Sequence, residues 1–253
     1  MPRLIGKVAF LTGGGAGIAK VSALEFVKEG AKVAIVDINA EVGKRAEQEI
    51  KDAGGEVIFI QADVTQDAAV KQAIDTAVAK FGKLNVLVNC AGGSVLEDVP
   101  VHEMRLDIWH KTITLNLLHP FLVCKHGIPH LIKAGGGSII NFSSMVGMTG
   151  LYRPAYAAAK GGIMSFTKTL AAQYVQYVQY GIRANAQTPS VPAASAPSDI
   201  SSAIKTRHGW KTKIPPGPSR NAWWCRSCIR FPSATRLILP ISWCFSRRMN
   251  RAC

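Results

Sequence analysis

Acidic residues are missing from the C-terminal part of this 253-residue chain. The last of them is Asp199, and from Ala203 onward eleven Lys and Arg residues account for +11 of the formal net charge of +14. The preceding part is therefore close to neutral. Because the positive charge belongs to one terminal segment, it does not by itself indicate an anionic partner for the whole protein.

Long apolar runs are also absent. No stretch reaches the roughly 18 residues that a membrane-spanning helix needs. The first residues, "MPRLIGKVAFLTGGG", run into glycines without a signal-peptide cleavage pattern. We therefore expect no membrane partner and a cytoplasmic location, where cysteines are reduced.

Cysteine is scarce until the end of the chain. Only Cys90 and Cys124 precede residue 221, whereas residues 221–253 hold four of the six cysteines and three of the five tryptophans. Cys225-x-x-Cys228 is a single pair without a second matching pair, so we expect no metal site. Arginines and tryptophans could bind nucleic acid, but the origin proposed for this segment below argues against a nucleic-acid partner.

Strand-like and helix-like segments alternate through the first 189 residues. We expect strands at 7–12, 31–37, 56–63, 84–89, 138–143 and 182–187, and helices at 18–28, 40–53, 66–80, 105–133 and 155–179. This alternation predicts an α/β fold, a doubly wound parallel sheet of Rossmann type in a single domain over residues 1–189. The ligand crevice of such a sheet lies at the C-terminal ends of its strands.

The first expected strand leads into the glycine-rich stretch "TGGGAGIAK". Glycines between a strand and a helix allow the backbone to approach a pyrophosphate at the helix N-terminus, although glycines also simply form turns. Asp37 ends the second strand, where a carboxylate can bind an adenosine ribose and repel a 2′-phosphate. No basic residue occupies position 16 or 38. NAD is therefore the expected cofactor, and NADP is the less favoured one.

A series of motifs resembles the short-chain dehydrogenase/reductase superfamily over residues 5–189. In order and at the spacings of that family, these are Thr12-Gly13-x-x-x-Gly17-x-Ala19, Asp63-Val64, Asn89-Cys90-Ala91-Gly92, Asn116, Ser143-Ser144 and Tyr156-x-x-x-Lys160. Each motif alone is weak evidence, and their ordered combination is strong. Cys90 departs from the usual second asparagine of the family.

The resemblance implies a role for each matching residue. Tyr156 is the expected general acid/base, Lys160 is expected to lower the pKa of Tyr156 and hold the nicotinamide ribose, and Asn116 is expected to position a proton-relaying water. Tyr156 and Lys160, four residues apart on one helix, share a face. The expected cofactor-binding residues are Gly13, Gly17, Ile18, Asp37, Asp63, Val64, Asn89, Ala91, Gly92, Tyr156 and Lys160.

Two adjacent serines compete for the role of orienting the substrate oxygen. Ser144 matches the family pattern Ser-x-x-Gly through Gly147, whereas Ser143 has the usual separation from Tyr156. We expect Ser144 to be the catalytic serine and keep Ser143 as the alternative.

The resemblance implies an NAD-dependent oxidoreductase that interconverts a secondary alcohol and a ketone. One alternative is the reduction of a 3-oxoacyl thioester, which usually uses NADP and so agrees poorly with Asp37. Another is an inactive dinucleotide-binding product of a damaged gene. The expected partners are a small alcohol or ketone and, with an intact C-terminus, further copies of the chain in a dimer or tetramer.

Residues 190–253 do not continue the family pattern. Back-translation of 241–251, with each codon started one base earlier, forces valine and glutamate at two positions and permits "DLLVLLASDEP". That string resembles the helix that the family has near its C-terminus. We interpret residues 190–253 as an atypical basic tail translated in a shifted frame, with the C-terminal strand and helix of the fold lost or scrambled.

Overall fold

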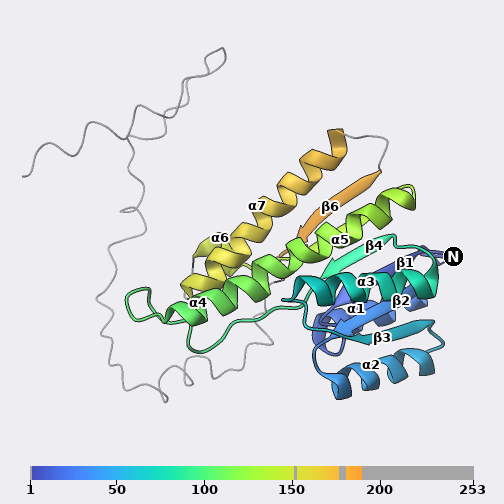
Figure 1. Ribbon diagram of the computed structural model, residues 1–253, viewed down its shortest axis with the longest axis horizontal. Coiled ribbons are helices and arrows are strands. Elements are labelled where there is room, and N and C mark those ends of the chain that lie inside the picture. The colour runs from blue at the N-terminus through green and yellow to red at the C-terminus, as the bar shows by residue number, and fades with distance from the viewer. Residues whose placement is uncertain (1, 151–152, 177–180, 190–253) are drawn as a thin grey trace, which may run out of the picture. The chain divides into compact units, whose positions relative to one another are not determined.

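In the part of the chain that the structure describes, six strands form one sheet with helices packed against it (Figure 1). The computed structural model describes residues 2–150, 153–176 and 181–189. Every strand pair in the sheet is parallel, and the order is β3-β2-β1-β4-β5-β6. The strands are β1 (Val8–Thr12), β2 (Lys32–Asp37), β3 (Val57–Gln61), β4 (Val86–Asn89), β5 (Gly137–Phe142) and β6 (Ile182–Gln187).

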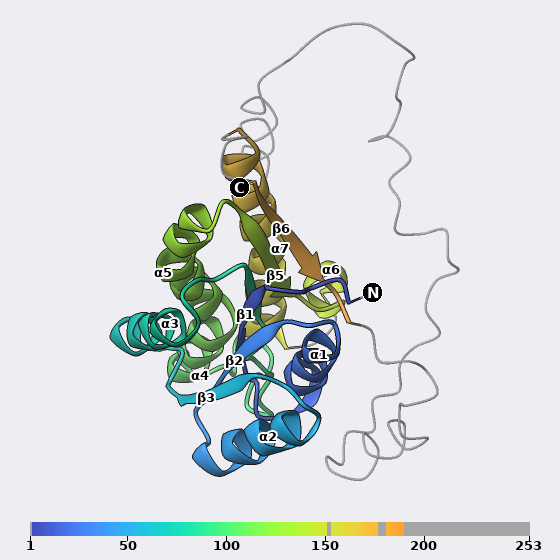
Figure 2. The same cartoon turned by 90° about the vertical axis from the view of Figure 1, so that its right-hand side faces the viewer.

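Helices cover both faces of this sheet (Figure 2). One apolar core contains residues of α1 and α2, and the other contains residues of α3, α5 and α7. Alternate strand residues serve the two cores: Ala9 and Leu11 pack on the first, and Val8 and Phe10 on the second. The covering helices are α1 (Gly17–Lys28), α2 (Ala40–Asp52), α3 (Asp67–Phe81), α5 (His119–Lys133) and α7 (Pro154–Gln176). The predicted doubly wound parallel sheet is confirmed.

The long helix expected at residues 105–133 contains an irregular turn. It consists of α4 (Leu106–Ile113), the π-helical turn η1 (Thr114–Leu118) and α5. Turns of this kind often occur at functional sites, and this one contains Asn116. A short helix, α6 (Val146–Thr149), lies between β5 and α7.

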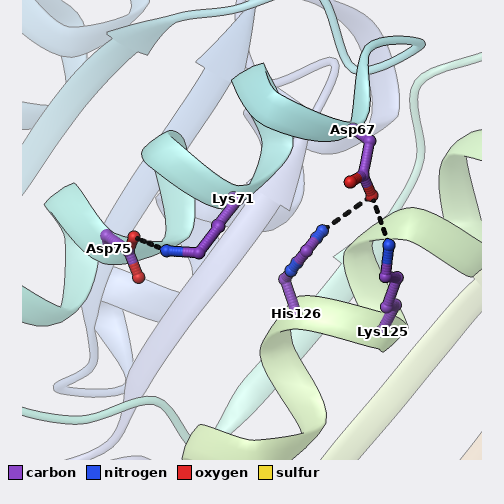
Figure 3. A network of polar contacts seen from close by, with 5 residues as sticks. All are labelled: Asp67, Lys71, Asp75, Lys125 and His126. Carbon is purple, nitrogen blue, oxygen red and sulfur yellow. Dashed lines mark hydrogen bonds and ion pairs between the residues drawn. The ribbon is translucent and has the colours of Figure 1, made fainter.

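Asp67 links the first turn of α3 to α5 (Figure 3). One of its carboxylate oxygens accepts hydrogen bonds from Lys125 Nζ at 2.9 Å and His126 Nε2 at 2.8 Å. These contacts lower the pKa of Asp67. An acidic residue at this position also interacts favourably with the helix dipole.

Two expectations lie wholly or partly outside the described residues. The last turn of the helix expected at 155–179 lies beyond Gln176, and the whole tail at 190–253 is outside. Among the described residues, no helix is long and apolar enough to cross a membrane. Within the same ranges, no group of three His, Cys, Asp or Glu side chains could hold a metal ion.

Candidate active site

A cavity of about 500 Å³ lies at the C-terminal ends of β1, β2 and β4, where the fold predicts a ligand crevice. Most of the expected cofactor-binding residues line it. The full lining is Gly13, Ala16, Gly17, Ile18, Val36, Asp37, Ile38, Ala62, Asp63, Val64, Cys90, Ala91, Gly92 and Leu115. Among the residues that the structure describes, this lining contains two acidic residues, Asp37 and Asp63, and no Lys or Arg.

The glycine-rich loop after β1 is pressed against the neighbouring strands. A Cβ on Gly14 would lie 2.5 Å from Ile35 Cβ, and one on Gly15 would lie 2.9 Å from Asp37 Oδ2. Gly13 has a φ of +69°, and a Cβ there would lie 3.0 Å from Ala91 Cα. Side chains are therefore excluded from three consecutive positions, and the loop backbone can approach a ligand closely. Gly14 and Gly15 were not among the expected site residues.

Asp37 ends β2 beside this loop. Its Oδ2 accepts a hydrogen bond from the Gly15 N–H at 3.1 Å, and its Oδ1 accepts one from the Asn39 N–H at 3.0 Å. Each carboxylate oxygen keeps further acceptor capacity. A ribose hydroxyl can donate to it, whereas a phosphate would meet a negative charge, and the described residues of the cavity wall include no Lys or Arg to offset it.

Asp63 and Val64 follow β3 on the far side of Asp37. Asp63 Oδ1 accepts hydrogen bonds from the backbone N–H and the hydroxyl of Thr65, at 2.9 and 2.7 Å. This local turn orients the carboxyl group without a contact to another element. Val64 is buried and contributes an apolar surface to the cavity.

Thr12 and the buried His119 hold the opposite wall in place. His119 Nδ1 lies 2.6 Å from the Leu115 carbonyl oxygen, which can only accept, so this nitrogen carries the proton. Nε2 is then an acceptor 3.1 Å from the Thr12 hydroxyl, whose one proton can go to it or to the Val88 carbonyl at 3.4 Å. Thr12 Oγ1 in turn accepts from the N–H groups of Cys90 and Ala91, at 3.1 and 3.2 Å. The network requires a neutral His119, and burial lowers the pKa of its imidazole to about 4.

Asn116 is fully buried in the π-helical turn and binds the loop after β4. Its Oδ1 accepts from the Gly93 N–H at 3.0 Å, and its Nδ2 donates to the carbonyls of Gly93 and Thr112, both at 2.9 Å. A Cβ on Gly92 would lie 2.7 Å from Asn116 Oδ1 and 3.3 Å from Lys160 Nζ. Gly92 therefore lies between the cavity and the side chains of Asn116 and Lys160, where a side chain would not fit.

Asn89 is placed differently from the other expected cofactor-binding residues. Its side chain is buried in the interior, where Nδ2 donates to Asn141 Oδ1 at 2.7 Å and to Cys124 Sγ at 3.6 Å. Asn141 continues the chain of hydrogen bonds to Thr167 Oγ1 at 2.9 Å. Asn89 does not line the cavity, and its side chain contacts β5 through Asn141 and α5 through Cys124.

Tyr156 lies in the first turn of α7. Burial raises the pKa of its phenol, while a hydrogen bond with Ser144 and the charge of Arg153 oppose the rise. The other serine, Ser143, does not face Tyr156 with its hydroxyl free. Ser143 is buried, and its hydroxyl donates to the Lys160 carbonyl at 2.8 Å. Of the two serines, the geometry brings Ser144 to Tyr156.

Lys160 lies one turn after Tyr156, with Nζ 5.6 Å from the centre of the phenol ring. Nζ donates to the Phe142 carbonyl at 2.8 Å, and burial lowers the pKa of the ammonium to about 8. The lowering of the Tyr156 pKa by Lys160 stays a prediction, and Ser144 and Arg153 also act to lower that pKa. Burial raises the pKa of Cys90, and the charge of Lys160 acts to lower it.

Several residues of the site carry no motif that could have identified them. His119 resembles any helix residue in the sequence, and Asp98 lies in the irregular segment between β4 and α4. Both are buried polar side chains. Such groups are seldom buried without a partner, but sequence alone does not tell which residues of a chain are buried.

The profile of the family described as short chain dehydrogenase matches residues 7–203. The resemblance, which was expected to end near residue 189, thus continues to residue 203.

Individual relatives and structures agree with this match. An uncharacterized oxidoreductase of Thermotoga maritima is 42% identical over 185 residues, which are 73% of this chain and 71% of that protein. A 2,5-dichloro-2,5-cyclohexadiene-1,4-diol dehydrogenase of Sphingobium indicum is 39% identical over 203 residues, 78% of this chain and 79% of that one. The crystal structure of an NAD⁺-bound xylitol dehydrogenase superposes with a TM-score of 0.70 at 34% identity, covering 74% of this chain and 71% of the other.

Proposed function

The chain belongs to the short-chain dehydrogenase family, and we propose that it is an NAD-dependent oxidoreductase that interconverts a secondary alcohol and a ketone. The observation that carries this proposal is the meeting of Tyr156, Ser144 and Lys160 beside a cavity with Asp37 in its wall. Acid/base and cofactor-binding groups are thereby brought to one place from β2, β5 and α7.

NAD suits the cavity better than NADP. The glycine loop leaves room for a pyrophosphate, and Asp37 has acceptor capacity for a ribose hydroxyl in a wall without Lys or Arg. The relative crystallised with NAD⁺ supports the same choice. We propose that the cofactor is held by Gly13, Gly17, Ile18, Asp37, Asp63, Val64, Ala91, Gly92, Tyr156 and Lys160. When bound, NAD supplies the acceptor or donor of the hydride.

Tyr156 transfers the proton in this proposal. On oxidation, the phenolate takes the proton of the alcohol hydroxyl as the hydride leaves the same carbon, and in the reverse direction the phenol returns it to the carbonyl oxygen. Ser144 lies near enough to Tyr156 to lower its pKa, and its hydroxyl can turn to donate to the same substrate oxygen. It thereby orients that oxygen toward the phenol.

Lys160 and Asn116 support this transfer. The Lys160 ammonium, fixed by the Phe142 carbonyl, stabilises negative charge that develops at the neighbouring phenol. Asn116 holds the loop at Gly92 and Gly93, and we propose that a water ordered between it and Lys160 relays the proton to solvent.

The proposal is tested first with Tyr156→Phe in a screen of NAD⁺ with xylitol and cyclic secondary alcohols. Turnover should disappear, while the Kd for NAD⁺ stays within about twofold, because the change removes a proton-transfer group. Lys160→Ala should lower turnover and also weaken the binding of NAD⁺. Tyr174→Phe makes the same chemical change further along α7 and should have no effect. Retained turnover in Tyr156→Phe would place the acid/base elsewhere.

Ser144→Ala and Ser143→Ala, assayed separately, test the choice of serine. Ser144→Ala should lower kcat by about 10²-fold, the typical size of an acid/base contribution. Ser143→Ala should act mainly on stability, because it leaves the Lys160 carbonyl without its donor. The opposite result would exchange the two roles.

Assembly and location also belong to the proposal. We propose that the intact protein forms a dimer or tetramer in the cytoplasm, and size-exclusion chromatography with light scattering would measure its mass. A monomer at every concentration would contradict the proposed assembly.

A further inference from the structure

The helix that carries Tyr156 begins without a capping side chain of its own. The first N–H groups of an α-helix have no partner within the helix. In α7, Pro154 occupies the first position and has no N–H, so Ala155 and Tyr156 present the first two donors. Ala157 already donates to the Arg153 carbonyl.

Asp98, from the segment between β4 and α4, accepts both of these donors. Its Oδ1 lies 3.1 Å from the Ala155 nitrogen, and its Oδ2 lies 2.8 Å from the Tyr156 nitrogen. The residue is only 5% exposed. A buried carboxylate bound by two N–H groups at a helix N-terminus is favoured by both hydrogen bonding and the helix dipole.

A second contact joins the same two segments. Arg153 Nη1 donates to the Val95 carbonyl at 2.6 Å, and Val95 also accepts from the Asp98 N–H at 3.3 Å. Arg153 has a φ of 55°, which is unfavourable for a residue with a side chain and needs support from its surroundings. Residues 95–98 and 153–156 thus form a clamp, a term used below for these residues only.

We propose that Asp98 is a positioning residue that holds the backbone of Tyr156 where the phenol can reach the substrate oxygen that Ser144 orients. The proposal rests on the proposed function of Tyr156. Asp98 binds the peptide nitrogen of Tyr156 itself, so its loss releases the point from which the phenol extends. Misplacement of a catalytic group by about 1 Å can cost about 10²-fold in rate.

The rest of the site is held independently of the clamp. Lys160 is fixed by the Phe142 carbonyl, and α6 packs closely on α7 there, since a Cβ on Gly147 would lie 2.6 Å from Lys160 C. Asp98 does not line the cofactor cavity, and of the clamp residues only Tyr156 is proposed to contact the cofactor. Loss of Asp98 should therefore affect the chemical step and leave cofactor binding intact.

The test uses the full chain with Asp98→Ala and Asp98→Asn. Asparagine keeps one acceptor oxygen, so Asp98→Asn should retain part of the capping and change the measured quantities less than Asp98→Ala. The matched control is Asp67→Ala, which removes another aspartate from the first turn of a helix and its contacts to a second element (Figure 3). Three quantities are measured: amide hydrogen exchange, the Kd for NAD⁺, and kcat with the best alcohol of the screen described above.

In Asp98→Ala, exchange at Ala155 and Tyr156 should accelerate by at least about fivefold, the factor expected from the loss of an N-cap. Exchange in β1 and β2 should not change. We expect kcat to fall at least tenfold while the Kd for NAD⁺ stays within twofold of that of the unaltered protein. The kcat of Asp98→Asn should lie between those of Asp98→Ala and the unaltered protein. If amide exchange in Asp98→Ala is fast in all elements, that variant is unfolded as a whole. Exchange, the Kd for NAD⁺ and kcat are then compared between Asp98→Asn and the unaltered protein alone.

Unchanged exchange at Ala155 and Tyr156 would overturn the proposal. So would faster exchange with an unchanged kcat, because Asp98 would then cap the helix without serving the reaction. If no alcohol is turned over, NMR titration of tyrosines labelled with ¹³C at Cζ replaces kcat. The Tyr156 pKa should fall in Asp98→Asn because burial is what raises it, and an unshifted pKa would overturn the proposal. Failure of the proposed function is recognised separately, by turnover that survives Tyr156→Phe.

Discussion

Replacing His119 by glutamine should reduce the loss of stability that the protein suffers in acid. His119 is buried, can accept from Thr12 and donates to Leu115, and so contributes to the fold only in its neutral form. Its pKa is about 4 in the folded protein because burial disfavours the imidazolium, against about 6.5 for the unfolded chain. Glutamine has both an amide donor and an acceptor for these contacts and does not titrate.

The sign of the effect follows from proton binding. Between pH 6.5 and 4 the unfolded chain binds a proton at this residue that the folded protein does not, so stability is present above pH 6.5 and lost as pH falls. The two pKa values correspond to a loss of about 2 kcal/mol by pH 5 and about 3 kcal/mol by pH 4. This is a large share of the 5–15 kcal/mol typical of a folded domain.

Urea unfolding at pH 7, 5 and 4, followed by tryptophan fluorescence, measures the effect. The difference in unfolding free energy between pH 7 and pH 5 should be about 2 kcal/mol smaller in His119→Gln than in the unaltered protein. The control is His126→Gln, which replaces a histidine of the same helix that pairs with Asp67 at the surface. Equal pH dependence in His119→Gln and the unaltered protein would show that His119 is not neutral in the fold.

Two further predictions concern the cofactor and the tail. NAD should bind at least about tenfold more tightly than NADP, as measured by calorimetry. Both Asp37→Ala and Asp37→Asn should narrow this difference in affinity, and Asp37→Asn does so by removing the charge while keeping an acceptor for the Gly15 N–H. Equal affinities for NAD and NADP in the unaltered protein would refute the assignment. Restoring the reading frame by one base in the tail should give a more soluble and more active dehydrogenase, whereas the chain as written should lose its tail in limited proteolysis; a protease-resistant tail on a fully active oligomer would contradict the shifted frame.

Features that depend on short stretches of chain were predictable from the sequence. The alternation of apolar segments with helical ones indicated the parallel sheet, because each segment carries its own period and its own pattern of burial. The glycine loop and Asp37 followed from the same logic, since a strand end and a helix start determine where a ligand can approach. The ordered motifs then indicated the family.

The irregular parts of the site were less accessible to this reasoning. Asn116 was expected in a regular helix but lies in a π-helical turn, which lets its amide bond to Gly93 as well as Thr112. Asn89 was expected at the cofactor and lies among Asn141 and Cys124. In both cases a partner of the side chain comes from a segment far away in the chain, and motif spacing does not contain that information.

The sequence by itself determined the order of strands and helices, the glycines where no side chain is tolerated and the pairing of Tyr156 with Lys160 one turn apart. Those features rest on steric limits and periodicity within a few residues. The tertiary structure alone decided that Ser144 meets Tyr156, that Asp98 caps the helix of Tyr156, and that a neutral His119 supports Thr12. Each of these contacts joins segments far apart in the chain, and their distances depend on how the sheet and helices pack.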